Sequence, residues 1–94
     1  MFQVEIYFKD LPDVAEYCSA TDEIFSRYSL PCIVKKANAR VYTDKGEKHD
    51  YGKLWASVSK IKETPMLVKA IRDGYWVNDS SGNRESLMNN FFKV

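Results

Sequence analysis

The stretch KHDYGKLWASV, residues 48–58, decides the fold of this 94-residue chain, because it fits both a strand and a helix. As a strand, it alternates small or apolar residues with larger polar and aromatic ones. As a helix over 50–61, it places Leu54, Val58 and Ile61 on one apolar stripe. Glycine, tryptophan and serine are weak helix formers, so the composition favours a strand.

Upstream of this stretch, two patterns are clear. Residues 2–9 alternate apolar and polar side chains, which predicts a strand with one wet face. Asp10 and Pro12 then provide a helix start. Apolar residues recur at steps of three and four from Leu11 onward, which predicts a helix over 11–28.

Residues 32–43 alternate again and predict one further strand. One face of this strand carries the polar side chains, including Lys36, Arg40 and Tyr42. The other face carries Ala39 and small or branched residues, so we expect that face to meet the core. The polar loop DKGEKHD then leads to the ambiguous stretch.

The rest of the chain predicts one more helix and one more strand. Thr64 and Pro65 form a helix start, and Gly74 provides a stop. Residues 75–79 read as a brief strand, and the SSGN sequence after them as a turn. The tail 86–94 fits either a strand or a helical turn.

The resulting order is strand, helix, strand, strand, helix, strand. This order predicts an α+β fold of the ferredoxin-like type, βαββαβ, with two helices on one face of a four-stranded antiparallel sheet. With 94 residues, the chain is expected to form a single domain, 1–94. The sheet face away from the helices is expected to be open, and any function is to be sought there.

Three segments resemble the RNA-recognition motif family: IYFKDLP at 6–12, HDYGKLWA at 49–56 and KAIRDGYWV at 69–77. The resemblance implies RNA binding, with Tyr7 and Tyr51 at positions where the family stacks bases. Lys53 stands where the family has its second aromatic of the third strand, which removes one stacking platform. His49 and Asp50 also depart from the family pattern, and Asp50 places a negative charge beside the expected phosphate path.

On this reading, one open sheet face carries aromatic and basic side chains suited to single-stranded nucleic acid, RNA in particular. The candidate nucleic-acid-binding residues are Tyr7, Lys36, Arg40, Tyr42, Tyr51, Lys53 and Trp55. The same composition suits a protein partner, so a protein–protein interaction adaptor or inhibitor of the phage or mobile-element type stays open. A homodimer through this face stays open too, as does a plain solvated surface.

Charge and composition narrow the classes of function that remain open. Net charge is only +1, but residues 1–30 hold six acids and two bases, whereas residues 31–60 hold seven bases and three acids. We expect an intracellular, cytoplasmic protein with no membrane segment, and Cys18 and Cys32 as free thiols. His49 has no nucleophile near it in the sequence, so no enzyme activity, catalytic residue, metal site or cofactor is predicted.

Overall fold

The computed structural model describes residues 1–78, 80–88 and 92, and these form one antiparallel sheet and three helices. The strands are β1 (Phe2–Phe8), β2 (Cys32–Lys36), β3 (Ala39–Thr43), β4 (Ile71–Asn78) and β5 (Asn83–Ser86). The helices are α1 (Val14–Arg27), α2 (Asp50–Lys62) and α3 (Pro65–Ala70).

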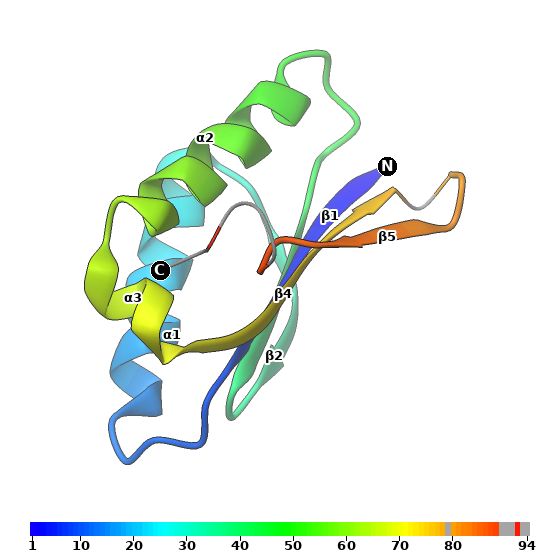
Figure 1. Cartoon of the computed structure of the whole chain (residues 1–94). Helices are drawn as coiled ribbons and strands as arrows, with labels where there is room; N and C mark the ends of the chain where they lie inside the picture. Colours follow the sequence, from blue (N-terminus) through cyan, green and yellow to red (C-terminus); the bar gives the residue numbers. More distant parts are fainter. Residues whose placement is uncertain (79, 89–91, 93–94) are drawn as a thin grey trace.

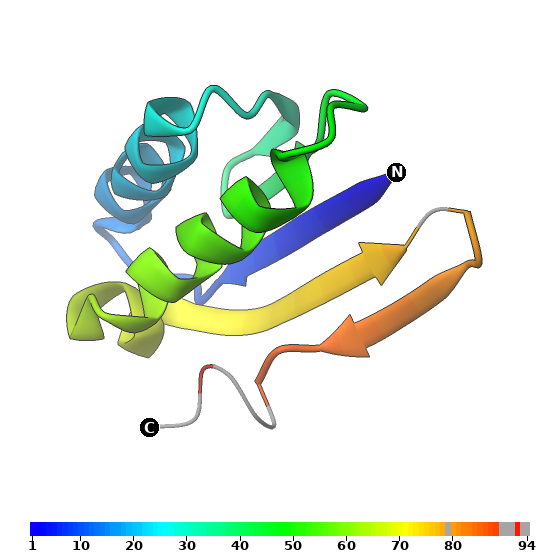
Figure 2. The same ribbon diagram turned by 90° about the horizontal axis from the view of Figure 1, so that it is seen from above.

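The sheet order is β2-β3-β1-β4-β5, and every neighbouring pair of strands is antiparallel. All three helices cover the same face of the sheet (Figure 1 and Figure 2). We call the opposite side the open sheet face, and its main residues are Gln3, Glu5, Tyr7, Lys36, Val41, Tyr75, Val77 and Arg84. The predicted α+β class is confirmed, but the described residues have five strands and three helices instead of four and two.

The central strand β1 follows its sequence pattern closely. Val4, Ile6 and Phe8 have no exposed surface and face the helices, whereas the residues between them face the open side. Strand β1 pairs with β3 on one side and with β4 on the other. The predicted strand over 2–9 is therefore confirmed, and so is the helix after it, although α1 begins at Val14 and ends at Arg27.

Residues 50–61 form a helix, so the predicted third strand is wrong. Leu54, Val58 and Ile61 have no exposed surface, since all three lie against the sheet. Burying each such side chain stabilises the fold by about 1.5–3 kcal/mol. This outweighs the roughly 1 kcal/mol that a glycine such as Gly52 costs inside a helix. The Ser57 hydroxyl donates to the backbone of Lys53 (2.9 Å), so this buried serine is satisfied.

Residues 32–43 form a hairpin of two strands, with the chain turning at Ala37 and Asn38. The predicted single strand is wrong, and within β3 its two predicted faces are also exchanged. Arg40 and Tyr42 face the helices, because Asp22 of α1 provides a partner for both polar groups. A tyrosine can then bury its ring in the core while its hydroxyl stays hydrogen-bonded.

The second predicted helix is shorter than expected. Helix α3 ends at Ala70, and Ile71 begins the eight-residue strand β4, so Gly74 lies within a strand and does not stop a helix. A Cβ atom at Gly74 would lie 3.1 Å from the Phe92 ring, so this glycine allows the ring to pack on the sheet. The alternatives for 86–94 fall mostly outside the described residues, namely at 89–91 and 93–94.

Two further predictions concern the cysteine thiols and membrane-spanning segments. Cys18 is buried and Cys32 half-buried, and both thiols are free, as predicted. Burial raises the pKa of the Cys18 thiol, which disfavours the reactive thiolate. Within the described residues, no helix combines the length and the apolar character that crossing a membrane requires.

Candidate nucleic-acid interface

Only two of the seven predicted site residues lie on the open sheet face. Tyr7 of β1 and Lys36 of β2 occupy one cross-strand row, because both are opposite Ala39 on either side of β3. Tyr7 is half-buried and Lys36 is exposed. The structure therefore brings these two together, but the other five lie elsewhere.

The aromatic rings of the open sheet face are already partnered within the molecule. The Tyr7 hydroxyl donates to Glu5 (2.8 Å), and its ring meets Tyr75 edge to face at 6.2 Å between centroids. Arg84 forms an ion pair with Glu5 (2.9 Å) and lies 3.7 Å over the Tyr75 ring. The hydrogen bond to Glu5 raises the pKa of Tyr7. A base that stacked on Tyr75 from the Arg84 side would have to displace that guanidinium.

Arg40 and Tyr42 are structural residues of the helix-facing core. Tyr42 is 1% exposed and stacks on Phe25 of α1, with 3.7 Å between centroids. Burial and the hydrogen bond to Asp22 raise the pKa of Tyr42. Arg40 pairs with the same carboxylate at 3.1 Å. Both side chains tie β3 to α1, so neither is available to a ligand.

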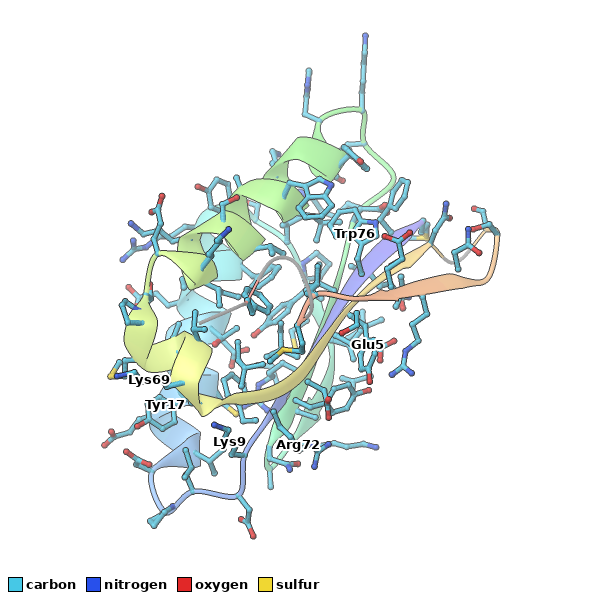
Figure 3. The ribbon with its side chains drawn as sticks, viewed as in Figure 1. Glu5, Lys9, Tyr17, Lys69, Arg72 and Trp76 are labelled. Atoms are coloured by element: carbon cyan, nitrogen blue, oxygen red, sulfur yellow. The ribbon has the colours of Figure 1, made fainter. Side chains whose placement is uncertain are left out.

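Tyr51, Lys53 and Trp55 belong to α2, and the two aromatic residues join a cluster that we call the aromatic corner. Its members are Phe2, Tyr51, Trp55 and Trp76. The Trp55 and Trp76 rings are stacked at 4.2 Å, and Tyr51 meets both Trp76 and Phe2 edge to face. Figure 3 shows Trp76 between the sheet and α2, and Glu5 on the side away from the helices.

A hollow of about 250 Å³ lies at the aromatic corner. Besides the four aromatic residues, its lining includes Asn78 of β4 together with Asn83 and Glu85 of β5. These three side chains are on the helix-facing side of the sheet, because they alternate with the open-face residues of their strands. The hollow thus has aromatic walls on the α2 side and polar groups on the β5 side.

The loop before α2 is held in place by two buried carboxylates. Asp50 accepts backbone N–H bonds from Lys45 (2.8 Å) and Glu47 (3.1 Å), and Asp44 accepts from Gly46 and Phe2. The bond from the Lys45 backbone, more than any other contact, lowers the pKa of Asp50. Asp50 therefore does not face incoming phosphates as an exposed charge, as its position in the sequence implied.

Two lysines of this loop, together with Glu47, are exposed to solvent next to the aromatic corner. Lys45, Lys48 and His49 are exposed, and Lys53 follows one turn into α2. A second hollow, of about 310 Å³, connects the loop with the corner, and its lining includes Lys48, Phe2 and Tyr51. Tyr51 borders both hollows, and the lining of the second hollow also includes the carboxylates of Asp44 and Glu47, so its aromatic rings lie beside charged groups of both signs.

Several residues of this site were not among the predicted nucleic-acid-binding residues: Phe2, Lys45, Lys48, Trp76, Asn78, Asn83 and Glu85. A signal for part of the set was present in the helical alternative for residues 50–61. In a helix, Tyr51 and Trp55 are four residues apart and share a face. The predicted turn SSGN after residues 75–79 was a signal for the pairing of β4 with β5, which brings Glu85 beside Trp76.

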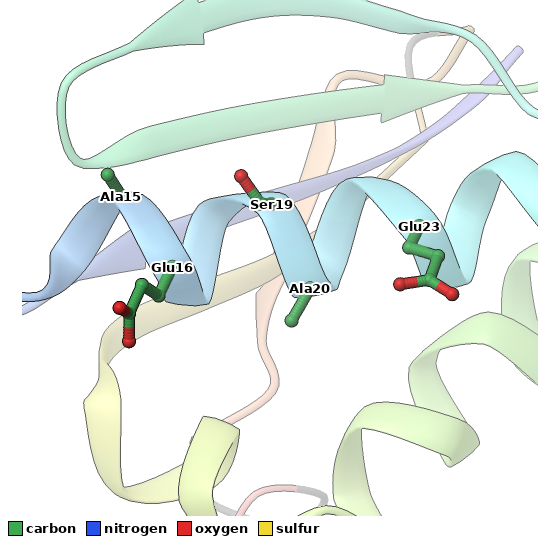
Figure 4. A pocket seen from close by; sticks show the side chains of 5 residues that line it. All are labelled: Ala15, Glu16, Ser19, Ala20 and Glu23. Carbon is green, nitrogen blue, oxygen red and sulfur yellow. The ribbon is translucent and has the colours of Figure 1, made fainter.

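A broad hollow on the exposed side of α1 offers no candidate site. Its lining is Ala15, Glu16, Ser19, Ala20 and Glu23 (Figure 4). The Ser19 hydroxyl points away from the carboxylates of Glu16 and Glu23, so the polar groups do not converge on one point. In the described part of the chain, no group of three or more histidine, cysteine or acidic side chains has the arrangement to hold a metal ion.

No protein-family model matches the chain, and neither the curated proteins nor the solved structures include a significant match. The resemblance to the RNA-recognition motif family therefore stays a prediction.

Proposed function

We propose that the protein binds single-stranded nucleic acid, RNA in particular, through the aromatic corner and the lysines of the adjacent loop. The observation that carries this proposal is the position of Tyr51. Its side chain is 50% exposed, and it borders the aromatic hollow on one side and the hollow next to Lys48 on the other. A nucleotide needs a ring for its base and a cation for its phosphate, and Tyr51 and Lys48 line the same hollow.

The proposed contacts predict modest affinity. Stacking of one base on an exposed aromatic ring contributes about 1–3 kcal/mol. Lys45 and Lys48 offer two phosphate contacts, since Lys53 pairs with Asp50 at 3.8 Å, and the net charge of +1 adds little long-range attraction. Binding should therefore be weak and should fall steeply with added salt.

The open sheet face, where the sequence analysis placed the site, is less suited to this role. Its rings already contact each other and Arg84, whereas the Tyr51 side chain is half exposed. Lys36 is the one lysine near Tyr7 in the cross-strand row. We therefore assign the stacking surface to Tyr51 and keep Tyr7 as the internal comparison.

The test is a titration of the protein with short single-stranded RNA and DNA at low salt, followed by amide chemical shifts. Tyr51→Ala should weaken binding about tenfold, within the range of a lost stacking contact. Tyr7→Ala is the matched control, because it removes the same ring from the open sheet face. If Tyr7→Ala weakens binding and Tyr51→Ala does not, the open sheet face is the site.

A protein partner remains the competing function. If neither RNA nor DNA shifts the amides of residues 44–55 at any concentration reached, the nucleic-acid proposal fails. An adaptor, inhibitor or self-associating protein then becomes the leading hypothesis. Sedimentation of the same sample separates self-association from the other two.

We also infer that the first four strands form a ferredoxin-like unit to which β5 is added. Support comes from the order β2-β3-β1-β4, in which β3 lies between β1 and β2 and is antiparallel to both. Strands β1 and β2 are therefore parallel and joined by α1, as in a split βαβ unit. The added strand β5 contributes two of the polar residues of the hollow at the aromatic corner.

A further inference from the structure

The hollow at the aromatic corner lies where the helix layer ends and the sheet continues. In Figure 2, α2 runs above β1 and β4, whereas β5 lies outside its cover. The register places Asn83 opposite Asn78 and Glu85 opposite Trp76. Polar side chains of β5 thus adjoin the aromatic rings under α2. At about 250 Å³, the hollow is below the roughly 300–1,000 Å³ of drug-sized ligand sites, so it suits one planar base.

The polar side of this hollow has unused hydrogen-bonding groups. The Glu85 carboxylate makes no hydrogen bond or ion pair with any described residue. The Asn78 side-chain oxygen accepts the Ser80 backbone N–H at 3.1 Å. The Asn78 amide nitrogen donates to no described residue, so it is left to donate to a ligand. Together they present two acceptor oxygens on Glu85 and a donor on Asn78.

We propose that this hollow selects guanine among the four bases of a single strand, an inference that rests on the proposed function. Guanine alone shows two adjacent N–H donors, N1–H and the N2 amino group, on its pairing edge, and a carboxylate accepts both at once. The O6 acceptor beside them matches the free amide donor of Asn78. The flat ring system lies against the aromatic walls of the same hollow.

The same carboxylate rejects the other bases. Uracil has one N–H between two carbonyl acceptors, and adenine and cytosine each pair one amino donor with a ring-nitrogen acceptor. An acceptor directed at the Glu85 carboxylate is repelled, because neither group has a proton to share. Specificity then comes as much from this mismatch as from the contacts made to guanine.

The experiment uses four RNA pentamers that differ only at the central base, UUGUU, UUAUU, UUCUU and UUUUU, titrated into the full chain at one low salt concentration. A single guanine avoids the structures that guanine runs form. We expect UUGUU to bind about tenfold more tightly than UUUUU, the size of one good bidentate contact.

Glu85→Gln tests the assigned group, because it keeps the shape and removes the paired acceptors. The variant should bind UUGUU and UUUUU within about threefold of each other, well below the tenfold step of one bidentate contact. Glu16→Gln on α1 is the charge-matched control, since Glu16 is exposed and lines a different hollow, and it should keep the guanine preference.

The outcomes separate the two proposals. Equal binding of all four pentamers by the unmodified protein overturns guanine selection but leaves nucleic-acid binding intact. A guanine preference that survives Glu85→Gln overturns the assignment to Glu85. If no pentamer binds, the proposed function itself fails. Amide spectra of both variants show whether each is folded, and the exposed position of Glu85 predicts that it is.

Discussion

The open sheet face and the aromatic corner both carry aromatic and charged side chains, but they differ in how far these side chains are partnered within the protein. On the open sheet face, Tyr7 and Tyr75 are held by Glu5 and Arg84, so aromatic and charged groups satisfy one another inside the protein. At the aromatic corner, Tyr51 is half exposed and the Glu85 carboxylate has no intramolecular partner among the described residues. Similar residues thus contact one another on the open sheet face, whereas at the aromatic corner some of them keep exposed groups.

Neighbouring residues of β4 provide the strongest test of this difference, because Trp76 and Tyr75 point to opposite faces. Trp76 is 7% exposed and is central to the aromatic corner, so Trp76→Ala should destabilise the fold by about 3–5 kcal/mol. Tyr75→Ala should cost about 1 kcal/mol, the size of an average substitution. Urea unfolding midpoints measure both. Equal losses would mean that the two surfaces are packed alike.

The salt dependence of RNA binding distinguishes the lysines beside the aromatic corner from the lysine on the open sheet face. Removing Lys45 and Lys48 together should reduce the slope of log affinity against log salt by about 1.4, the value for two phosphate contacts to a single strand. Lys36→Ala, on the open sheet face, should leave the slope unchanged. Titrations of one RNA at several salt concentrations give the slopes. A reduced slope for Lys36→Ala alone would move the phosphate path to the open sheet face.

Acid should destabilise the loop before α2, which Asp50 holds in place. The pKa of Asp50 is lowered in the folded protein, so its carboxylate stabilises the fold above the unfolded value of 3.8. That contribution is lost as pH falls from 3.8 through the lower folded pKa. Asp50→Asn should be less stable than the unmodified protein at neutral pH, and the difference should shrink in acid. Thermal unfolding at several pH values measures the gap. A gap independent of pH would show that the charge of Asp50 is not involved.

Alkali should affect the open sheet face, with the smallest effect of the series. The pKa of Tyr7 is raised, so its neutral hydroxyl stabilises the fold below the unfolded value of 10.0, and this is lost as pH rises through the folded pKa. Tyr7→Phe, which has no hydroxyl to ionise, should become relatively more stable than the unmodified protein above pH 10.0. Unfolding midpoints on either side of that pH test the sign. A constant difference would contradict the role of the bond to Glu5.

Local periodicity predicted the elements that bury one clear stripe. The alternation around Val4 and Ile6 gave the central strand, and the helical spacing after Leu11 gave most of α1. In residues 50–61, weak helix propensity and a good apolar stripe disagreed. Propensity was the weaker guide, because burial of Leu54 and Val58 under the helix layer contributes more than Gly52 costs.

The site could be predicted less well than the fold, for a specific reason. Arg40 and Tyr42 look like surface residues until Asp22, from another element, provides their partner. Likewise, Glu85 becomes a site residue only because β5 pairs with β4 and places Glu85 beside Trp76. The contact of Asp22 with Arg40 and Tyr42 joins residues that are distant in sequence, and no local pattern encodes it, whereas the SSGN turn was a local signal for the pairing of β4 with β5. Tyr51 was chosen correctly as exposed, although on the wrong kind of element.

The stacking of Trp55 on Trp76 also gives the protein an optical property. The chain has two tryptophans, and both are in this one pair, so its indole absorption and emission arise from a single place. Rings 4.2 Å apart couple their electronic transitions, and such coupling depends on their mutual angle. Circular dichroism in the indole bands therefore reports the angle between these two rings, because the chain has no other tryptophan to contribute to the signal.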